Sequence, residues 1–199
     1  MDRNRKVSYF FHPNQLWTPA DILREPSRIP KLKGLYGWYF APALPAVPFE
    51  GCVRSGNWTL LYVGIAGQNA QSKEDLRTRI KEHLKGKARG STLRLSLGCL
   101  LQHELDLIPQ RYGCGKRIWF GEIGEARLTQ WMRLHARVAW IVDDEPWEIE
   151  VPAIESYSLP LNIEHNAAHQ FSSVLKAIRK ACKQEAKYDS FSSNSDSHR

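Results

Sequence analysis

Four side chains of this sequence suit chemistry on a phosphate group. Tyr36 and Tyr62 lie in two aromatic runs, and Arg79 and His83 follow the second run, one helical turn apart. A guanidinium stabilises charge on phosphate oxygens, while an imidazole or a phenol can orient water or move a proton. These residue types point to phosphodiester hydrolysis.

Carboxylates gather late in the chain. Residues 138–164 hold seven Asp and Glu but no Lys or Arg, whereas residues 73–117 hold eleven Lys and Arg and five acids. A basic surface beside an acidic cluster fits a polyanion held against a divalent cation, because phosphates attract Lys and Arg while Mg²⁺ prefers carboxylate oxygens. Ordinary solvated charge gives the same counts, so residue types and spacing must decide.

Two strands and a helix are needed to position these groups. Residues 34–40 and 59–63 are runs bounded by turn residues, which predicts two strands of a hairpin with a long connection. Leu76, Ile80 and Leu84 recur every four residues, which predicts an amphipathic helix over residues 73–85 with Arg79 and His83 beside its apolar stripe.

Similar patterns predict the remaining elements. Helices are expected at residues 18–24, from Ser91 or Thr92 to about 105, at 128–135 and at 172–187, with further strands at 117–120 and 137–142. A helix carrying Glu150 is expected from Pro146 toward Tyr157, although Pro152 favours a start near Val151. The fold class is therefore α/β (α+β), with a small, mainly antiparallel central sheet flanked by helices.

Five short motifs give the sequence a resemblance to the GIY-YIG nuclease superfamily, over residues 34–162. They are Gly34-Leu35-Tyr36, Tyr62-Val63-Gly64, Leu76-Arg77-Thr78-Arg79-Ile80 with His83, Glu150, and Asn162 twelve residues later. The resemblance implies a metal-dependent endonuclease that hydrolyses phosphodiester bonds in DNA. The sequence departs from the family at Ile65, where many members carry a lysine, and at Pro152.

The resemblance implies catalytic roles for Tyr36, Tyr62, Arg79, His83 and Glu150. Arg79 would stabilise the transition state, Tyr and His would orient or activate water, and Glu150 would bind Mg²⁺ or another divalent cation such as Mn²⁺. A phenol has a pKa of about 10, so either nearby cations make Tyr36 a base or a metal-bound hydroxide is the nucleophile; both routes stay open.

Some assignments keep alternatives. Glu148 and Glu155 stay possible metal ligands, because Pro152 disturbs the register of the helix that carries them. His165 and His169 have the spacing of a helical zinc pair, but no third ligand pattern stands nearby, so zinc is not favoured.

DNA is expected to bind across a basic face. The expected substrate-binding residues are Gly64, Arg77, Lys81, Lys85, Lys87, Arg89 and Asn162. The main alternative function is a nucleic-acid-binding module of the same fold that has lost catalysis, which Ile65 and Pro152 favour. A structural or interaction domain is a third class, and the preference for DNA over RNA stays open.

The chain length suits one domain, since 199 residues with 42% hydrophobic content can build one core. We expect residues 1–33 to pack on the domain as an extension, residues 34–187 to form the nuclease domain with a basic C-terminal helix, and residues 188–199 to be a disordered tail. No run reaches the roughly 18 apolar residues of a membrane span, so a cytoplasmic protein is expected. Reduced thiols are expected at Cys52, Cys99, Cys114 and Cys182.

Overall fold

The computed structural model describes residues 7–8, 10–42, 44, 46–113 and 117–186. The tail expected at residues 188–199 and the thiol of Cys114 lie outside these residues. In the described part of the chain, no helix is both long and apolar enough to cross a membrane.

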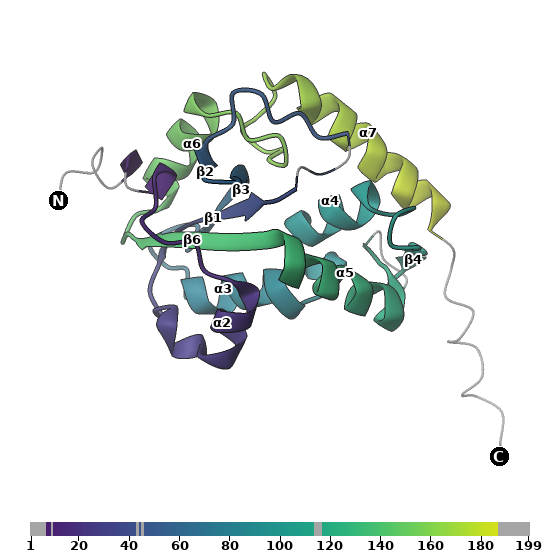
Figure 1. Cartoon of the computed structure of the whole chain (residues 1–199), viewed down its shortest axis with the longest axis horizontal. Coiled ribbons are helices and arrows are strands. Elements are labelled where there is room, and N and C mark those ends of the chain that lie inside the picture. The colour runs from purple at the N-terminus through teal and green to yellow at the C-terminus, as the bar shows by residue number, and fades with distance from the viewer. Residues whose placement is uncertain (1–6, 9, 43, 45, 114–116, 187–199) are drawn as a thin grey trace, which may run out of the picture.

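Four antiparallel strands form the central sheet, in the order β2-β3-β1-β6 (Figure 1). The strands are β1 (Gly34–Phe40), β2 (Arg54–Ser55), β3 (Trp58–Ala66) and β6 (Ala136–Val142). β1 pairs with β3 as expected, with Tyr36 opposite Gly64 and Trp38 opposite Tyr62. The predicted class and the antiparallel sheet are confirmed, while β2 lies in a segment expected to be a loop.

The two sheet faces carry separate hydrophobic clusters, because side chains alternate along a strand. One face carries Tyr36 and Tyr62 and packs against the apolar stripe of α3 (Leu76–Lys85). The opposite face carries Val63 and Ile65 and packs against α6 (Trp147–Ser156). Figure 1 shows α3 and α6 on opposite sides of the sheet.

Helices and short 3-10 turns surround the first cluster. The other helices are α2 (Pro19–Arg24), α4 (Thr92–Leu100), α5 (Gly121–His135) and α7 (Gln170–Glu185), with short 3-10 turns η1 (Pro26–Arg28) and η2 (Ala88–Gly90). α3 begins at Leu76 because the Asp75 carboxylate accepts a hydrogen bond from the Thr78 amide at 2.8 Å. Ser91, rather than Thr92, caps α4 in the same way.

Some predicted helix boundaries are wrong. α4 ends at Leu100, short of the expected residue 105, and α5 begins at Gly121, well before residue 128. Of the two starts considered for α6, the structure has the one at Pro146: the helix begins at Trp147, with Pro152 inside it. Pro152 cannot donate to the carbonyl of Glu148, but Glu148 is exposed, so water can bond that carbonyl.

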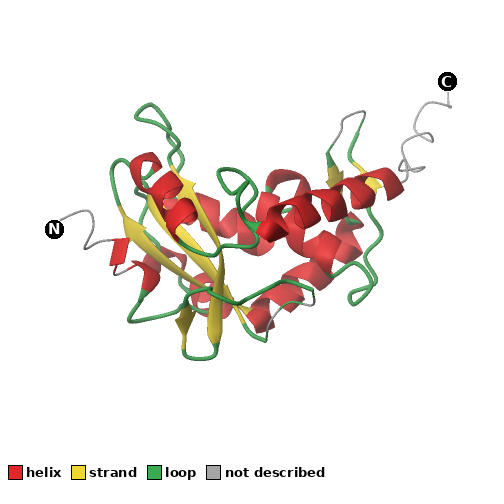
Figure 2. Ribbon diagram, turned by 90° about the horizontal axis from the view of Figure 1, so that it is seen from above, coloured by secondary structure: helices red, strands yellow, loops and turns green. Residues whose placement is uncertain are grey.

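A small hairpin and the N-terminal segment complete the domain. The hairpin consists of β4 (Gln110–Arg111) and β5 (Ile118–Trp119), which contacts η2. In the N-terminal segment, Phe10 and Phe11 are buried, and the Trp17 backbone exchanges two hydrogen bonds with Val138 of β6. Seen from above, the strands of the sheet gather at one end of the molecule and α4, α5 and α7 at the other (Figure 2).

Candidate active site

A buried hydrogen-bonded chain joins β1, α3 and the start of α4. The Tyr36 hydroxyl lies 2.7 Å from Nε2 of His83, and Nδ1 of His83 lies 2.7 Å from the Ser91 hydroxyl. Gly64 leaves room for this contact, since a Cβ atom there would lie 2.5 Å from the Tyr36 oxygen. The predicted residue Gly64 therefore positions Tyr36, by offering it space from the neighbouring strand.

Burial sets the protonation of this chain. Tyr36 is 1% exposed and His83 is fully buried. Desolvation lowers the pKa of His83 well below its usual value, and the charges of Arg79 and Arg94 act in the same direction. Desolvation raises the pKa of Tyr36 well above its usual value, with the Arg79 charge opposing it. Both side chains are therefore neutral at neutral pH.

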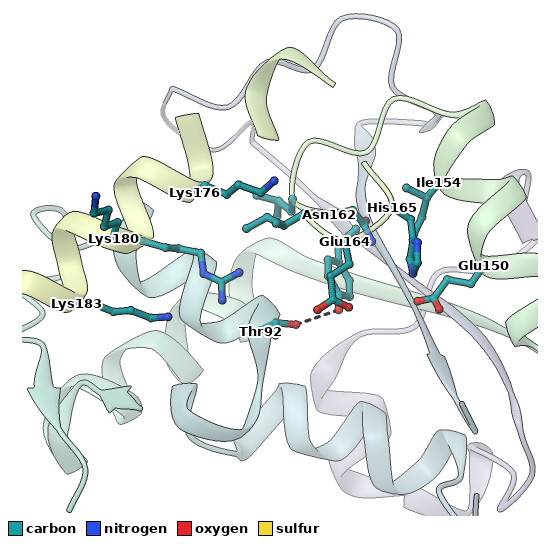
Figure 3. Close-up of a pocket in the computed structure, with 13 residues that line it drawn as sticks. Thr92, Glu150, Ile154, Asn162, Glu164, His165, Lys176, Lys180 and Lys183 are labelled. Atoms are coloured by element: carbon teal, nitrogen blue, oxygen red, sulfur yellow. Dashed lines mark hydrogen bonds between the residues drawn. The ribbon is translucent and has the colours of Figure 1, made fainter. Parts of the chain in front are cut away.

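Tyr62 connects this interior to a pocket of about 400 Å³ (Figure 3). Its hydroxyl lies 3.3 Å from the hydroxyl of Thr92. Glu150 and His165 line the same pocket. Burial is the main reason that the pKa of Tyr62 is raised, while the Thr92 hydrogen bond and the Arg79 charge lower it. Tyr62 therefore lines the same pocket as Glu150, the residue that the family resemblance makes the metal ligand.

Arg79 stands beside the tyrosines and is held by two carboxylates. One terminal nitrogen lies 2.8 Å from Oε2 of Glu82 and 3.8 Å from Oε1 of Glu74. Burial by itself lowers the pKa of Arg79. Tyr36 and the two carboxylates raise this pKa by more than burial lowers it, so the pKa lies above its usual value. The guanidinium stays charged at the boundary between the interior and solvent.

The three candidate glutamates of α6 face different cavities. Glu150 lines the pocket of Tyr62, whereas Glu148 and Glu155 line two others. Burial raises the pKa of Glu150, and the charge of His165 opposes that effect. The helix register thus places Glu150, alone among the three, in the pocket with Tyr62.

The residues present fit a divalent cation bound by one protein ligand. No group of three or more His, Cys, Asp and Glu side chains in the described residues could hold a metal ion. Within the same residues, the Glu150 carboxylate forms no hydrogen bond or ion pair, although burial disfavours its charged form. A carboxylate of this kind suits Mg²⁺, which binds through one or two carboxylates plus water and substrate phosphate.

Several cations expected to bind DNA are engaged within the protein. Arg77 donates hydrogen bonds to the backbone carbonyls of Ile29 at 2.7 Å and Ser27 at 3.3 Å, which attaches the N-terminal segment to α3. Lys81 is half-buried and Lys85 is exposed on the same helix, and neither forms an ion pair with a described residue. Only these two keep free ammonium groups on α3.

The two expected cations after α3 contact aromatic rings. Lys87 forms an ion pair with Glu122 and lies over the Trp119 ring. The Arg89 guanidinium lies 3.8 Å from the centre of the Tyr112 ring. Both contacts hold η2 close to the β4–β5 hairpin.

Asn162 makes its contacts with the sheet. Its side-chain oxygen accepts from the Val63 amide at 2.9 Å, and its side-chain nitrogen donates to the Val63 carbonyl at 2.8 Å. The side chain thus occupies the hydrogen-bonding position of a neighbouring strand, beside Tyr62 and Gly64. Ile65 stands where many members of the family carry a lysine. It is buried on the face of the sheet that packs against α6.

Sequence reasoning missed the residues that complete the pocket from α7. Lys176, Arg179, Lys180 and Lys183 line the pocket together with Tyr62 and Glu150. Figure 3 shows Lys176 and Lys183 extending from α7 on the side of the pocket opposite Glu150. The spacing i, i+3, i+4 and i+7 marks one basic helix face, but nothing in the sequence says what that face meets.

The histidine pair has two separate tasks. Nδ1 of His169 accepts from the Phe171 amide at 3.2 Å, so it caps α7, while its Nε2 lies 3.1 Å from the Ser158 hydroxyl. His165 lines the pocket beside Glu150.

Comparison with known proteins gives one match. Residues 34–181 match the family model described as the GIY-YIG catalytic domain. No curated protein and no solved structure gives a significant match.

Proposed function

Because the chain belongs to the GIY-YIG catalytic domain family, we propose that it is a metal-dependent endonuclease that hydrolyses phosphodiester bonds in DNA. The observation that carries the proposal is that the five residues cluster around one pocket from four elements. Tyr62 and Glu150 line the pocket, the hydrogen-bonded pair of Tyr36 and His83 lies next to Tyr62, and the Arg79 charge acts on both tyrosines. Rigid strands and helices hold all five, as an active site requires.

The hydrogen bonds of Ser91 support an assignment of the His83 proton. The Ser91 oxygen accepts from the Arg94 amide at 3.1 Å, so its own hydrogen is free to donate to Nδ1 of His83. Nε2 of His83 then carries the proton and donates to the Tyr36 oxygen. In this arrangement the two ring nitrogens of His83 and the hydroxyl oxygens of Tyr36 and Ser91 all have partners. The hydrogen of the Tyr36 hydroxyl is left to bond water.

This arrangement gives Tyr36 a role toward the attacking water. Burial keeps the free phenol neutral, since the pKa of Tyr36 is raised in the structure. Donation from His83 and the charge of Arg79 both favour a phenolate. For Tyr36 to act as the base, its own proton first leaves to solvent; the phenolate then takes one proton from the attacking water as the new oxygen–phosphorus bond forms and the bond to the leaving oxygen breaks.

Arg79 and the metal share the developing negative charge. The Arg79 guanidinium binds non-bridging phosphate oxygens in place of its contacts with Glu82 and Glu74. A divalent cation held by Glu150 would supply Lewis-acid stabilisation of the phosphate and the leaving oxygen. Tyr62, in hydrogen-bond contact with Thr92, lines the wall that orients the phosphate.

Incubation of the purified full chain with supercoiled plasmid tests this function. With Mg²⁺ we expect conversion to nicked or linear DNA, and with EDTA no conversion. Tyr36→Phe keeps the ring but removes the hydroxyl, so it should lose most of the rate while it folds normally. If Tyr36→Phe cleaves at the wild-type rate, the role given to Tyr36 is wrong.

The alternative function is a binding module without catalysis. It is favoured because Tyr36 is only 1% exposed, which limits the access of water to its hydroxyl. The same plasmid experiment separates the two functions. Salt-dependent DNA binding without Mg²⁺-dependent cleavage would favour the binding module.

A further inference from the structure

A basic groove leads from the catalytic pocket along α7. A second cavity of about 420 Å³ shares Thr92, Arg179 and Lys183 with the catalytic pocket, so the two cavities are adjacent. The second cavity extends to Arg89 of η2 and to Arg117 beside β5. We name this second cavity the basic groove.

The charge of the groove is of one sign. Arg89, Arg117, Arg179 and Lys183 line it, and none of its lining residues in the described chain is acidic. None of these four cations forms an ion pair with a described carboxylate, although Arg89 lies over the Tyr112 ring. Four cations that form no ion pair give the groove an excess of positive charge, so the groove attracts a polyanion.

The groove also has an electrostatic link to the catalytic residues. The pKa of Arg179 is lowered by burial, while the neighbouring Tyr62 and Glu164 act to raise it. Arg179 therefore stands where the groove opens into the catalytic pocket. A strand with its reacting phosphate near Tyr62 and Glu150 has its next phosphates within reach of Arg179 and Lys183.

We propose that the basic groove binds the sugar–phosphate backbone of the DNA strand next to the bond that is cleaved. This proposal rests on the proposed function for the identity of the substrate. It assigns substrate binding mainly to α7, η2 and β5, and leaves the outer face of α3, with Lys81 and Lys85, outside the contact.

A pair of charge-reversal variants tests the groove. Arg117→Glu with Lys183→Glu changes two exposed groove residues, and Lys81→Glu with Lys85→Glu makes the same change of charge on α3. Binding of a fluorescein-labelled 20-base-pair duplex is measured by anisotropy in EDTA, so that no cleavage occurs. Thermal unfolding of each variant shows that the protein is folded.

The groove variant should bind the duplex roughly 10- to 100-fold more weakly, and its log–log salt slope should be shallower by about 2, since each phosphate contact contributes about 0.9. The α3 variant should lose less than about threefold. Equal losses in the two variants, or a groove variant with wild-type affinity, would overturn the proposal.

Kinetics with Mg²⁺ separate a failure of the groove from a failure of the proposed function. We expect the groove variant to raise KM and to leave kcat nearly unchanged. A wild-type protein that cleaves, with the same KM as the groove variant, refutes the groove and keeps the function. A wild-type protein that does not cleave but binds DNA through the groove refutes the function and keeps the groove.

Discussion

α3 and α7 are both basic helices, yet their cations face different partners. On α3, Arg77 bonds two backbone carbonyls and Arg79 pairs with Glu82. On α7, Arg179 and Lys183 line the pocket and form no ion pair within the described part of the protein. The comparison teaches that the number of charges on a helix does not identify a ligand surface, because those side chains can be bonded to partners within the protein.

Among substitutions on α3 and α7, the one at Arg79 should have the largest effect, and it should act on turnover. Arg79→Ala should reduce kcat by roughly 10²- to 10³-fold, because a positioned donor to the transition state is lost. DNA affinity should change less than about threefold, since the proposed groove places most of the binding on α7. Plasmid cleavage and duplex anisotropy measure the two quantities, and Lys85→Ala on the same helix serves as the control.

Equal losses of affinity and turnover in Arg79→Ala would place Arg79 among the binding residues. Arg79→Lys keeps the charge but loses the planar fork that contacts two oxygens. Arg79→Lys should recover little of the cleavage rate that Arg79→Ala loses. Full recovery would show that a positive charge at this position is enough for catalysis.

The inward face of α3 predicts an acid instability. The pKa of His83 is lowered in the fold, so below its unfolded value of about 6.5 the unfolded chain binds more protons. The free energy of unfolding should therefore fall as pH decreases below about 6.5, by up to about 1.4 kcal/mol per pH unit. Above about pH 6.5 His83 should cause no such loss of stability. Urea unfolding at several pH values measures this slope, which His83→Gln should reduce; an equal slope in the variant would contradict the account.

Arg77 tests whether an α3 cation is structural. Arg77→Ala removes the donor to the carbonyls of Ile29 and Ser27 and should lower the free energy of unfolding by about 1–2 kcal/mol. DNA affinity should stay near the wild-type value. A stable variant with weak DNA binding would return Arg77 to the DNA surface that the sequence suggests.

The smallest expected effect is at single surface lysines. Lys183→Gln should make the log–log salt slope of DNA binding shallower by about 0.9, the contribution of one phosphate contact. Lys87→Gln should leave the slope unchanged, because Lys87 is paired with Glu122. Anisotropy titrations at four salt concentrations measure both slopes, and a larger change for Lys87→Gln would reverse the comparison of the two regions.

Local patterns predict most of the elements because their causes are local. The aromatic-rich strand around Tyr36 and the stripe of Leu76, Ile80 and Leu84 each depend on neighbouring residues, and both are confirmed. The sequence offered two starts for α6, near Pro146 and near Val151, and could not decide between them, because the tolerance of Pro152 depends on the exposure of Glu148 in the folded chain.

The site was predictable where chemistry needs a residue type, and less so where tertiary contacts decide. The Tyr36–His83 contact follows from strand pairing and helix packing. The partners of Arg77 and the clamp of Asn162 on Val63 join residues far apart in the chain, so spacing holds no sign of them. The basic face of α7 is visible in the sequence, but its position beside Glu150 is set by the packing of α4 against α7.

Glu150→Gln tests the central claim, that the pocket of Tyr62 and Glu150 is a metal-dependent nuclease site. Burial raises the pKa of Glu150, so its charge costs stability at neutral pH, and Glu150→Gln should be at least as stable as the wild type. The direct measurement is the Mg²⁺-dependent rate of plasmid nicking for the wild type, Glu150→Gln, Glu148→Gln and Glu155→Gln. We expect no rate above background for Glu150→Gln and near wild-type rates for the other two; a fully active Glu150→Gln would contradict the claim.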